Sequence, residues 1–293
     1  MRIYFDTSAI NAITDDSAKP RIVSKLTSEH EPLLSSLTLT EMVSTPNKSR
    51  RLKLFIVASR LSTVSASPPR RLLVDEWDMM RRSLEAFVLG TDNINYFKSP
   101  ENFPELFFLL DPYCVLDKTY TEITSEWSGG IEDRHHASMS SMRAESQETF
   151  KQFPPPDKAL IQQGRTALLR HLVNDSSFLT EWVTGKLADS DFAGLNNKVA
   201  GRELDVLLAL DAWRFSIAST IIQIYNRLIK ESGYGRKKNP GWVDTKQSVY
   251  LAAADVFVTD DINQRNMLRL LAKFGRVPRR IWSYNRLRTE LGL

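Results

Sequence analysis

The chain has 293 residues, of which 42% are hydrophobic and 25% are charged. This composition is typical of one large globular domain, or of a core domain with an added module, and it argues against a mostly disordered chain. The single cysteine, Cys114, excludes an internal disulfide framework and a zinc site built from several thiolates, and it favours a reducing compartment.

The charge is mildly basic and is gathered in small clusters. Lys and Arg number 39 against 35 Asp and Glu, which leaves a net charge of +4. A polyanionic partner suits such clusters, because each neutralised phosphate releases counterions, although a solvated surface is the simpler explanation of the charge alone. The clusters lie at residues 48–51, 70–71, 81–82, 236–238 and 276–280.

The start of the chain does not resemble a secretory signal. Only one arginine follows Met1, and no long apolar stretch comes before the next charged residues. No run elsewhere approaches the roughly 18 apolar residues of a membrane span. We therefore expect a cytoplasmic protein with no membrane partner.

Residues 1 to about 60 predict strands alternating with helices. The apolar run at 3–5 predicts a buried strand, and the apolar pattern from Ala9 predicts a helix. A second strand is expected near 33–39, with a helix from Thr40 to about residue 53. Short apolar runs bounded by helices are typical of parallel strands.

The end of the chain repeats this pattern, whereas the middle differs. Strands are expected at 256–259 and 280–283, with helices at 262–274 and 285–291. The fold class is therefore α/β, with a parallel central sheet flanked by helices. In between, helical patterns separated by prolines predict a large, mostly helical insertion at 61–234, within a discontinuous core of residues 1–60 and 235–293. The helical patterns of the insertion lie at 72–89, 131–150, 159–173 and 203–230.

Acidic residues stand at four places where an open α/β sheet would gather them. Asp6 follows the first strand, and Glu41 falls in the first turn of the helix after the second strand. Asp244 precedes an alanine-rich helix, and Asp260 and Asp261 follow the strand at 256–259. Ligands bind beyond the carboxyl ends of parallel strands, so we expect these carboxylates in one cleft. Each acid alone is also explained as a helix cap or a turn residue.

Three or four clustered carboxylates suit Mg²⁺ or Mn²⁺, which prefer hard oxygen ligands. Such an ion activates a bound water and stabilises charge that develops on a phosphoryl oxygen. The acids therefore predict phosphodiester hydrolysis. The glycine-rich phosphate loops and the Gly-x-Ser-x-Gly elbow of other enzyme classes are absent from the sequence.

Taken together, these motifs resemble the PIN-domain nucleases, over about residues 1–60 and 235–293. The last block, in which the run from Ala253 to Asp261 follows Asp244, is the most specific part. The long stretch between Glu41 and Asp244 departs from a compact PIN domain. The matching segments are Phe5-Asp6-Thr7-Ser8-Ala9, Thr40-Glu41, Asp244 and Ala253-Ala254-Asp255-Val256-Phe257-Val258-Thr259-Asp260-Asp261.

The resemblance implies a central parallel sheet, an Mg²⁺ or Mn²⁺ cofactor, and RNA rather than DNA as the favoured substrate. It implies a hydroxyl role for Thr259, and another for Ser8 or Thr7. Arg265 and the 236–238 cluster are candidate contacts to a phosphate backbone, or else solvated surface. The implied metal-binding and catalytic set is Asp6, Glu41, Asp244 and Asp261, with Asp260 as the alternative to Asp261, and the implied substrate-binding set is Ser8, Thr259, Arg265, Lys237 and Lys238.

We therefore predict a metal-dependent endonuclease, and more specifically an endoribonuclease. Two alternatives stay open. One is a catalytically inert PIN-fold protein that binds nucleic acid or acts as a scaffold, and the other is a structure-selective DNA nuclease. A homo-oligomer is compatible with the sequence, which gives neither the RNA target nor the role of the insertion.

Overall fold

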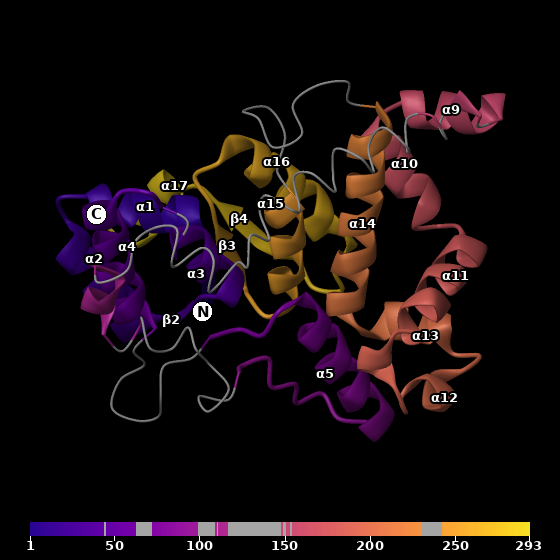
Figure 1. The fold of residues 1–293 in the computed structure, drawn as a ribbon, viewed down its shortest axis with the longest axis horizontal. Helices are drawn as coiled ribbons and strands as arrows, with labels where there is room; N and C mark the ends of the chain where they lie inside the picture. Colours follow the sequence, from indigo (N-terminus) through magenta and orange to yellow (C-terminus); the bar gives the residue numbers. More distant parts are fainter. Residues whose placement is uncertain are drawn as a thin grey trace.

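A four-stranded sheet lies between helical layers in the computed structural model, and all of its strand pairs are parallel (Figure 1). The predicted α/β class with a parallel sheet is thus confirmed. The helix expected at 131–150, apart from residue 148, and the cations Lys237 and Lys238 lie outside the described residues. The structure describes residues 1–43, 45–62, 72–98, 109, 111–116, 148, 151–152, 154–229 and 242–293.

The strand order places the start of the chain in the middle of the sheet. The order is β2-β1-β3-β4, and Tyr4 of β1 pairs with Leu33 on one side and Phe257 on the other. From β1 the chain moves outward to β2, and later from β3 outward to β4 in the opposite direction. This reversal creates a switch point between β1 and β3, where open parallel sheets bind ligands beyond their carboxyl ends. The strands are β1 (Arg2–Phe5), β2 (Glu31–Leu33), β3 (Val256–Val258) and β4 (Arg280–Trp282).

One face of the sheet packs against helices from both ends of the chain. Side chains alternate between the two faces of a strand, so Ile3 and Phe5 enter the same core as Val258. Figure 1 shows these helices together on one side of the sheet. They are α1 (Thr7–Asp15), α2 (Lys19–Glu29), α3 (Ser36–Val43), α4 (Lys48–Leu61) and α17 (Tyr284–Glu290).

The other face packs mainly against the region predicted as an insertion. Tyr4 and Phe257 enter this second core together with Trp213, whose buried indole Nε1 donates to the carbonyl of Met80 at 3.0 Å. The inserted helices thus form much of one covering layer, and the division into core and insertion stays a prediction. The remaining helices in the described residues are α5 (Glu76–Leu89), η2 (Pro112–Leu116), α9 (Pro155–Gln162), α10 (Arg165–Leu172), α11 (Ser176–Leu187), η3 (Ser190–Phe192), α12 (Asn196–Val199), α13 (Glu203–Ala209), α14 (Asp211–Ile229), α15 (Trp242–Lys246), η4 (Gln247–Ala252), α16 (Ile262–Leu271) and η5 (Ala272–Phe274).

The prediction of a strand through residue 39 is wrong. Strand β2 ends at Leu33, and α3 begins at Ser36. The hydroxyl of Ser35 accepts from the Thr38 N–H at 3.3 Å, which is the arrangement of a helix cap. Glu41 therefore lies in the second turn of α3 and not in its first. The single helix expected from residue 40 to 53 is likewise two helices, α3 and α4.

Two long helices expected in the middle of the chain are each interrupted. Gly164, at φ 106°, separates α9 from α10, and extended backbone at Leu210 separates α13 from α14, which meet at 101°. Strands β3 and β4 and helices α16 and α17 agree with the predicted ranges within a few residues. Taken singly, no helix in the described part of the chain is long and apolar enough to cross a membrane.

The packing of α14 against the connection from α16 to β4 can be tested at Gly275. A Cβ atom at this residue would lie 2.7 Å from Cζ of Phe215, a fully buried side chain of α14. We expect Gly275→Ala to lower the free energy of unfolding by about 1–3 kcal/mol through overpacking, measured by urea denaturation.

Gly185, inside α11, provides the matched control. An added Cβ there meets nothing within 4 Å, so Gly185→Ala should leave the free energy of unfolding unchanged or raise it by up to about 1 kcal/mol. Equal effects of the two substitutions would contradict close packing at Gly275.

Candidate functional site

Asp6 stands at the carboxyl end of β1 and caps helix α1. Its Oδ1 accepts from the Ala9 N–H at 2.8 Å, and the Ser8 hydroxyl lies 2.9 and 3.0 Å from its two carboxylate oxygens. The residue is 3% exposed. The Ser8 hydroxyl also accepts from the Asp260 N–H at 2.7 Å. A single hydroxyl therefore joins the end of β1 to the end of β3.

Glu41 extends from α3 to the start of α1. Its Oε2 accepts from the Thr7 hydroxyl at 2.5 Å and from Nε2 of Gln247 at 3.1 Å. Gln247 lies three residues after Asp244, so the chain segment that carries Asp244 also reaches Glu41. The structure thus brings Asp6, Glu41 and Asp244 to the same end of the sheet.

Two buried glutamines connect Glu41 to the end of β3, and we call this pair, Gln247 and Gln264, the glutamine bridge. Nε2 of Gln264 donates to Oε1 of Gln247 at 2.8 Å, and the Thr259 hydroxyl donates to Oε1 of Gln264 at 2.6 Å. All three side chains are fully buried. The Thr259 hydroxyl also lies 3.2 Å from that of Ser8, so a series of polar contacts links the support of Asp6 to Glu41.

Burial and repulsion by neighbouring carboxylates raise the pKa of Asp6 and of Glu41, two of the three central acids Asp6, Glu41 and Asp244. Burial raises the pKa of Asp6 to about 7, although hydrogen bonds from Ala9, Thr259 and Ser8 oppose the shift. Burial, followed by the charge of Asp244, raises the pKa of Glu41 to about 8. Within the described part of the chain neither carboxyl forms an ion pair with a cationic side chain. A bound cation would favour the charged forms and reverse both shifts.

Asp260 and Asp261 are placed differently from the three central acids. Oδ1 of Asp261 accepts from the Asn263 and Gln264 N–H groups at 2.6 and 2.8 Å, so this exposed carboxylate caps α16. The charge of exposed Asp260 acts on Tyr284, which belongs to the core on the face of the sheet that α1 and α17 cover. A role for either residue in metal binding stays a prediction.

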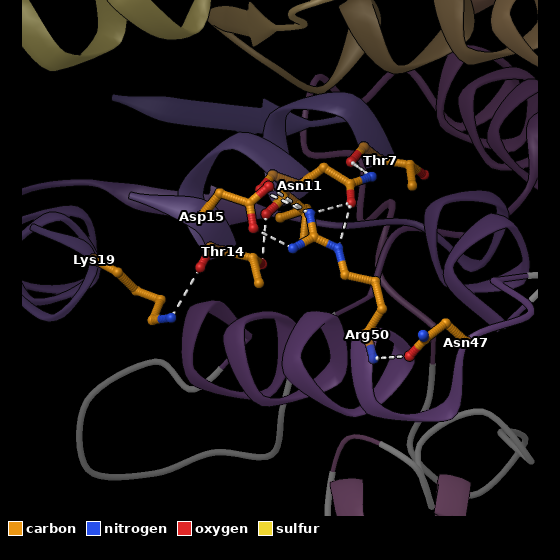
Figure 2. A network of polar contacts seen from close by, with 8 residues as sticks. Thr7, Asn11, Thr14, Asp15, Lys19, Asn47 and Arg50 are labelled. Carbon is orange, nitrogen blue, oxygen red and sulfur yellow. Dashed lines mark hydrogen bonds and ion pairs between the residues drawn. The ribbon is translucent and has the colours of Figure 1, made fainter. Parts of the chain in front are cut away.

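Arg50 and Arg51, which belong to the basic cluster at 48–51, form hydrogen bonds within the protein close to the site. Nη2 of Arg50 on α4 donates to Oδ1 of Asn11 at 2.7 Å and to Oδ2 of Asp15 at 2.8 Å (Figure 2). Nδ2 of Asn11 donates in turn to the Thr7 carbonyl at 2.9 Å. Arg51 is fully buried and donates to backbone carbonyls. Helix α4 thereby fixes the first turn of α1.

The donor set fits a hard divalent cation by its chemistry. Carboxylate oxygens are the ligands that Mg²⁺ and Mn²⁺ prefer, and Asp244 is near enough for its charge to raise the pKa of both Asp6 and Glu41. In the present side-chain positions, no three His, Cys, Asp or Glu residues of the described ranges form a group that could hold a metal ion. Ligation would therefore require these carboxylates to rotate toward a shared ion.

Comparison of the chain with protein-family models, with curated proteins and with solved structures gives no match. The function of this site is therefore inferred from its chemistry and from the resemblance in its motifs.

The sequence interpretation missed the glutamine bridge, although one signal for it was present. Gln264 follows Asp261 by three residues, which is the spacing of a capping box. In a capping box its amide would turn back to the N–H of Asp261. That N–H instead lies 3.2 Å from the hydroxyls of Ser8 and Thr259, which leaves Gln264 to contact Gln247.

The raised pKa values predict how stability changes with pH when divalent ions are absent. An acid whose pKa is higher in the folded state binds more protons there, so the free energy of unfolding should fall as the pH rises from about 4 to about 8. Asp6→Asn and Glu41→Gln remove these titrations. Each variant should therefore gain stability relative to wild type as the pH rises, which urea denaturation at pH 5 and pH 8 in EDTA can measure.

Asp157→Asn controls for the loss of one negative charge, because Asp157 is exposed on α9. If the free energy of unfolding depended on pH in the same way in this control and in the two site variants, the raised pKa values of Asp6 and Glu41 would be refuted.

Proposed function

We propose that this chain is a metal-dependent endonuclease that hydrolyses phosphodiester bonds in RNA. The observation that carries the proposal is the gathering of Asp6, Glu41 and Asp244 beyond the carboxyl ends of a parallel sheet, with the pKa of the first two raised. Carboxylates that repel one another at such a switch point suit a divalent cation, and a divalent cation there suits a phosphodiester.

Asp6, Glu41 and Asp244 would hold Mg²⁺ or Mn²⁺. When bound, such an ion lowers the pKa of a coordinated water and stabilises charge on the phosphoryl group. The chain itself fixes the carboxylates. Ser8 holds Asp6, while Thr7 and Gln247 hold Oε2 of Glu41. Asp261 or Asp260 belongs to the proposed metal set as a further ligand, direct or through water.

The resemblance to PIN-domain nucleases supports the same proposal, since it implies a parallel sheet with acids at its carboxyl edge. The choice of RNA over DNA, and a cytoplasmic setting, rest on the sequence interpretation. Ser8, Thr259 and Arg265 are the proposed substrate contacts beside the acids, and Nη1 of Arg265 donates to the Thr259 carbonyl at 3.4 Å.

The proposal predicts metal-dependent cleavage of single-stranded RNA. Wild type should cut a mixed RNA pool in Mn²⁺ or Mg²⁺, and EDTA should abolish the cuts. Asp6→Asn and Asp244→Asn should each lower the cleavage rate by about 100-fold or more, because each removes a charged ligand. Asp6→Asn keeps a good helix cap, so a loss of activity would not follow from loss of α1.

Asp157→Asn is again the matched control and should cut at the wild-type rate. Competition with flapped DNA separates the two nucleic acids, since preferential cutting of the flap would favour a structure-selective DNA nuclease. Intact RNA and DNA, with both still bound, would favour an inert binding protein.

A second prediction concerns the metal without any substrate. Mn²⁺ binds only the folded site, so it should raise the melting temperature of wild type, with a stabilisation of about 2.7 kcal/mol at 100 times the dissociation constant. Asp6→Asn should show little of this shift, whereas Asp157→Asn should show all of it. An equal rise in melting temperature in all three proteins would show that Mn²⁺ binds somewhere other than at Asp6.

A further inference from the structure

Much of the positive charge of the chain lies in one segment that follows the acidic site in the sequence. Residues 262–280 contain six basic residues and no acidic one, whereas the whole chain has a net charge of only +4. The remainder of the molecule is therefore slightly acidic. The six residues are Arg265, Arg269, Lys273, Arg276, Arg279 and Arg280.

Three of these cations lie in a line along α16 and the turn that follows it. The opposite side of the helix is buried in the core through Met267, Leu268 and other residues. Arg265, Arg269 and Lys273 are spaced by four residues, so they occupy neighbouring positions on the outer side. The line is about 12 Å long at the rise of an α-helix.

The outer cations of this line are not neutralised by the protein. Arg269 and Lys273 are exposed, and neither forms an ion pair or a side-chain hydrogen bond with any residue that the structure describes. Most other basic clusters with described residues differ in this respect, since Arg50 and Arg81 are both paired with carboxylates. The line along α16 thus retains charge for an external partner.

A cavity of about 490 Å³ lies at the far end of the line. Four basic residues and no carboxylate line it, together with Ile281 and small residues of the connection to β4. The side chain of Arg279 is 10% exposed and pairs with Asp211 at 3.2 Å through Nη2, yet its buried Nε has no partner in the described part of the chain. A buried donor without an acceptor is costly, and an anionic oxygen would satisfy it. The basic residues are Arg269, Lys273, Arg276 and Arg279.

We propose that the line Arg265, Arg269 and Lys273, together with this cavity, is a basic track that binds the phosphate backbone of single-stranded RNA. The track begins beside the acids, where Arg265 contacts the Thr259 carbonyl. The assignment of RNA to the track therefore rests on the proposed function. A strand whose scissile phosphate lies at the acids would then place its following phosphates along α16 and in the cavity.

The chemistry of the track indicates backbone recognition rather than base recognition. Guanidinium and ammonium groups at regular spacing neutralise phosphates, which position a strand without reading its sequence. The bound length would therefore matter more than the base composition. Binding along the track does not itself require cleavage.

The test measures binding of a fluorescent oligouridylate to the full chain in EDTA, where cleavage is off, at several KCl concentrations. Arg269→Ala combined with Lys273→Ala should weaken binding and reduce the slope of log K against log salt by about 1.4, which corresponds to two lost phosphate contacts on a single strand. Arg170→Ala combined with Lys198→Ala removes the same charge from exposed residues of α10 and α12, and it should keep the wild-type slope.

Equal losses in the two double variants would overturn the track, because net charge alone would then explain binding. An oligothymidylate of the same length should lose affinity in the track variants by a similar factor, because phosphate contacts do not read the 2′-hydroxyl, and a loss confined to RNA would overturn backbone recognition. If the track variants lose RNA binding while wild type cuts no nucleic acid, the track stands and the nuclease proposal fails. If wild type cuts RNA and the track variants bind it normally, the nuclease proposal stands and the track fails.

Discussion

The fold holds Asp6, Glu41 and Asp244 close together at a buried site, where water screens their charges poorly. In the part of the chain that the structure describes, Asp6 and Glu41 are held by neutral donors, the hydroxyls of Thr7 and Ser8 and the amide of Gln247, and not by cationic side chains. Hydrogen bonds to a carboxylate lower its pKa, but here burial outweighs them. The ion-pair network of Arg50 and the glutamine bridge fix the backbone that carries these groups.

Several elements were predictable because their signals are local. The apolar runs of β1, β3 and β4 are short and are bounded by helices, and Asp6 follows its strand directly. Strand β2 was extended too far because Leu33, Leu37 and Leu39 also fit a half-buried strand. The cap at Ser35 decided for helix instead, and this moved Glu41 to the second turn of α3.

Other features could not be predicted, because they depend on contacts between distant parts of the chain. The amide of Gln247 reaches Glu41 across 206 positions, and no pattern in either neighbourhood announces it. An amphipathic helix shows that it has a buried face without showing what covers that face. The sequence could therefore not reveal that Trp213 and its neighbours share a core with Tyr4 of β1.

The central position of β1 has a consequence for how the protein is made. Its neighbour β3 pairs Val256 with Ile3, so a ribosome must synthesise most of the chain before that side of β1 has a partner. Until then the nascent chain carries an unpaired edge made of buried-type residues, which is a template for wrong pairing. Closing the sheet also brings together ends separated by a very long loop, and folds dominated by such distant pairings form slowly. Segments made in between, including the helices that later cover the sheet, are available to shield that edge during synthesis.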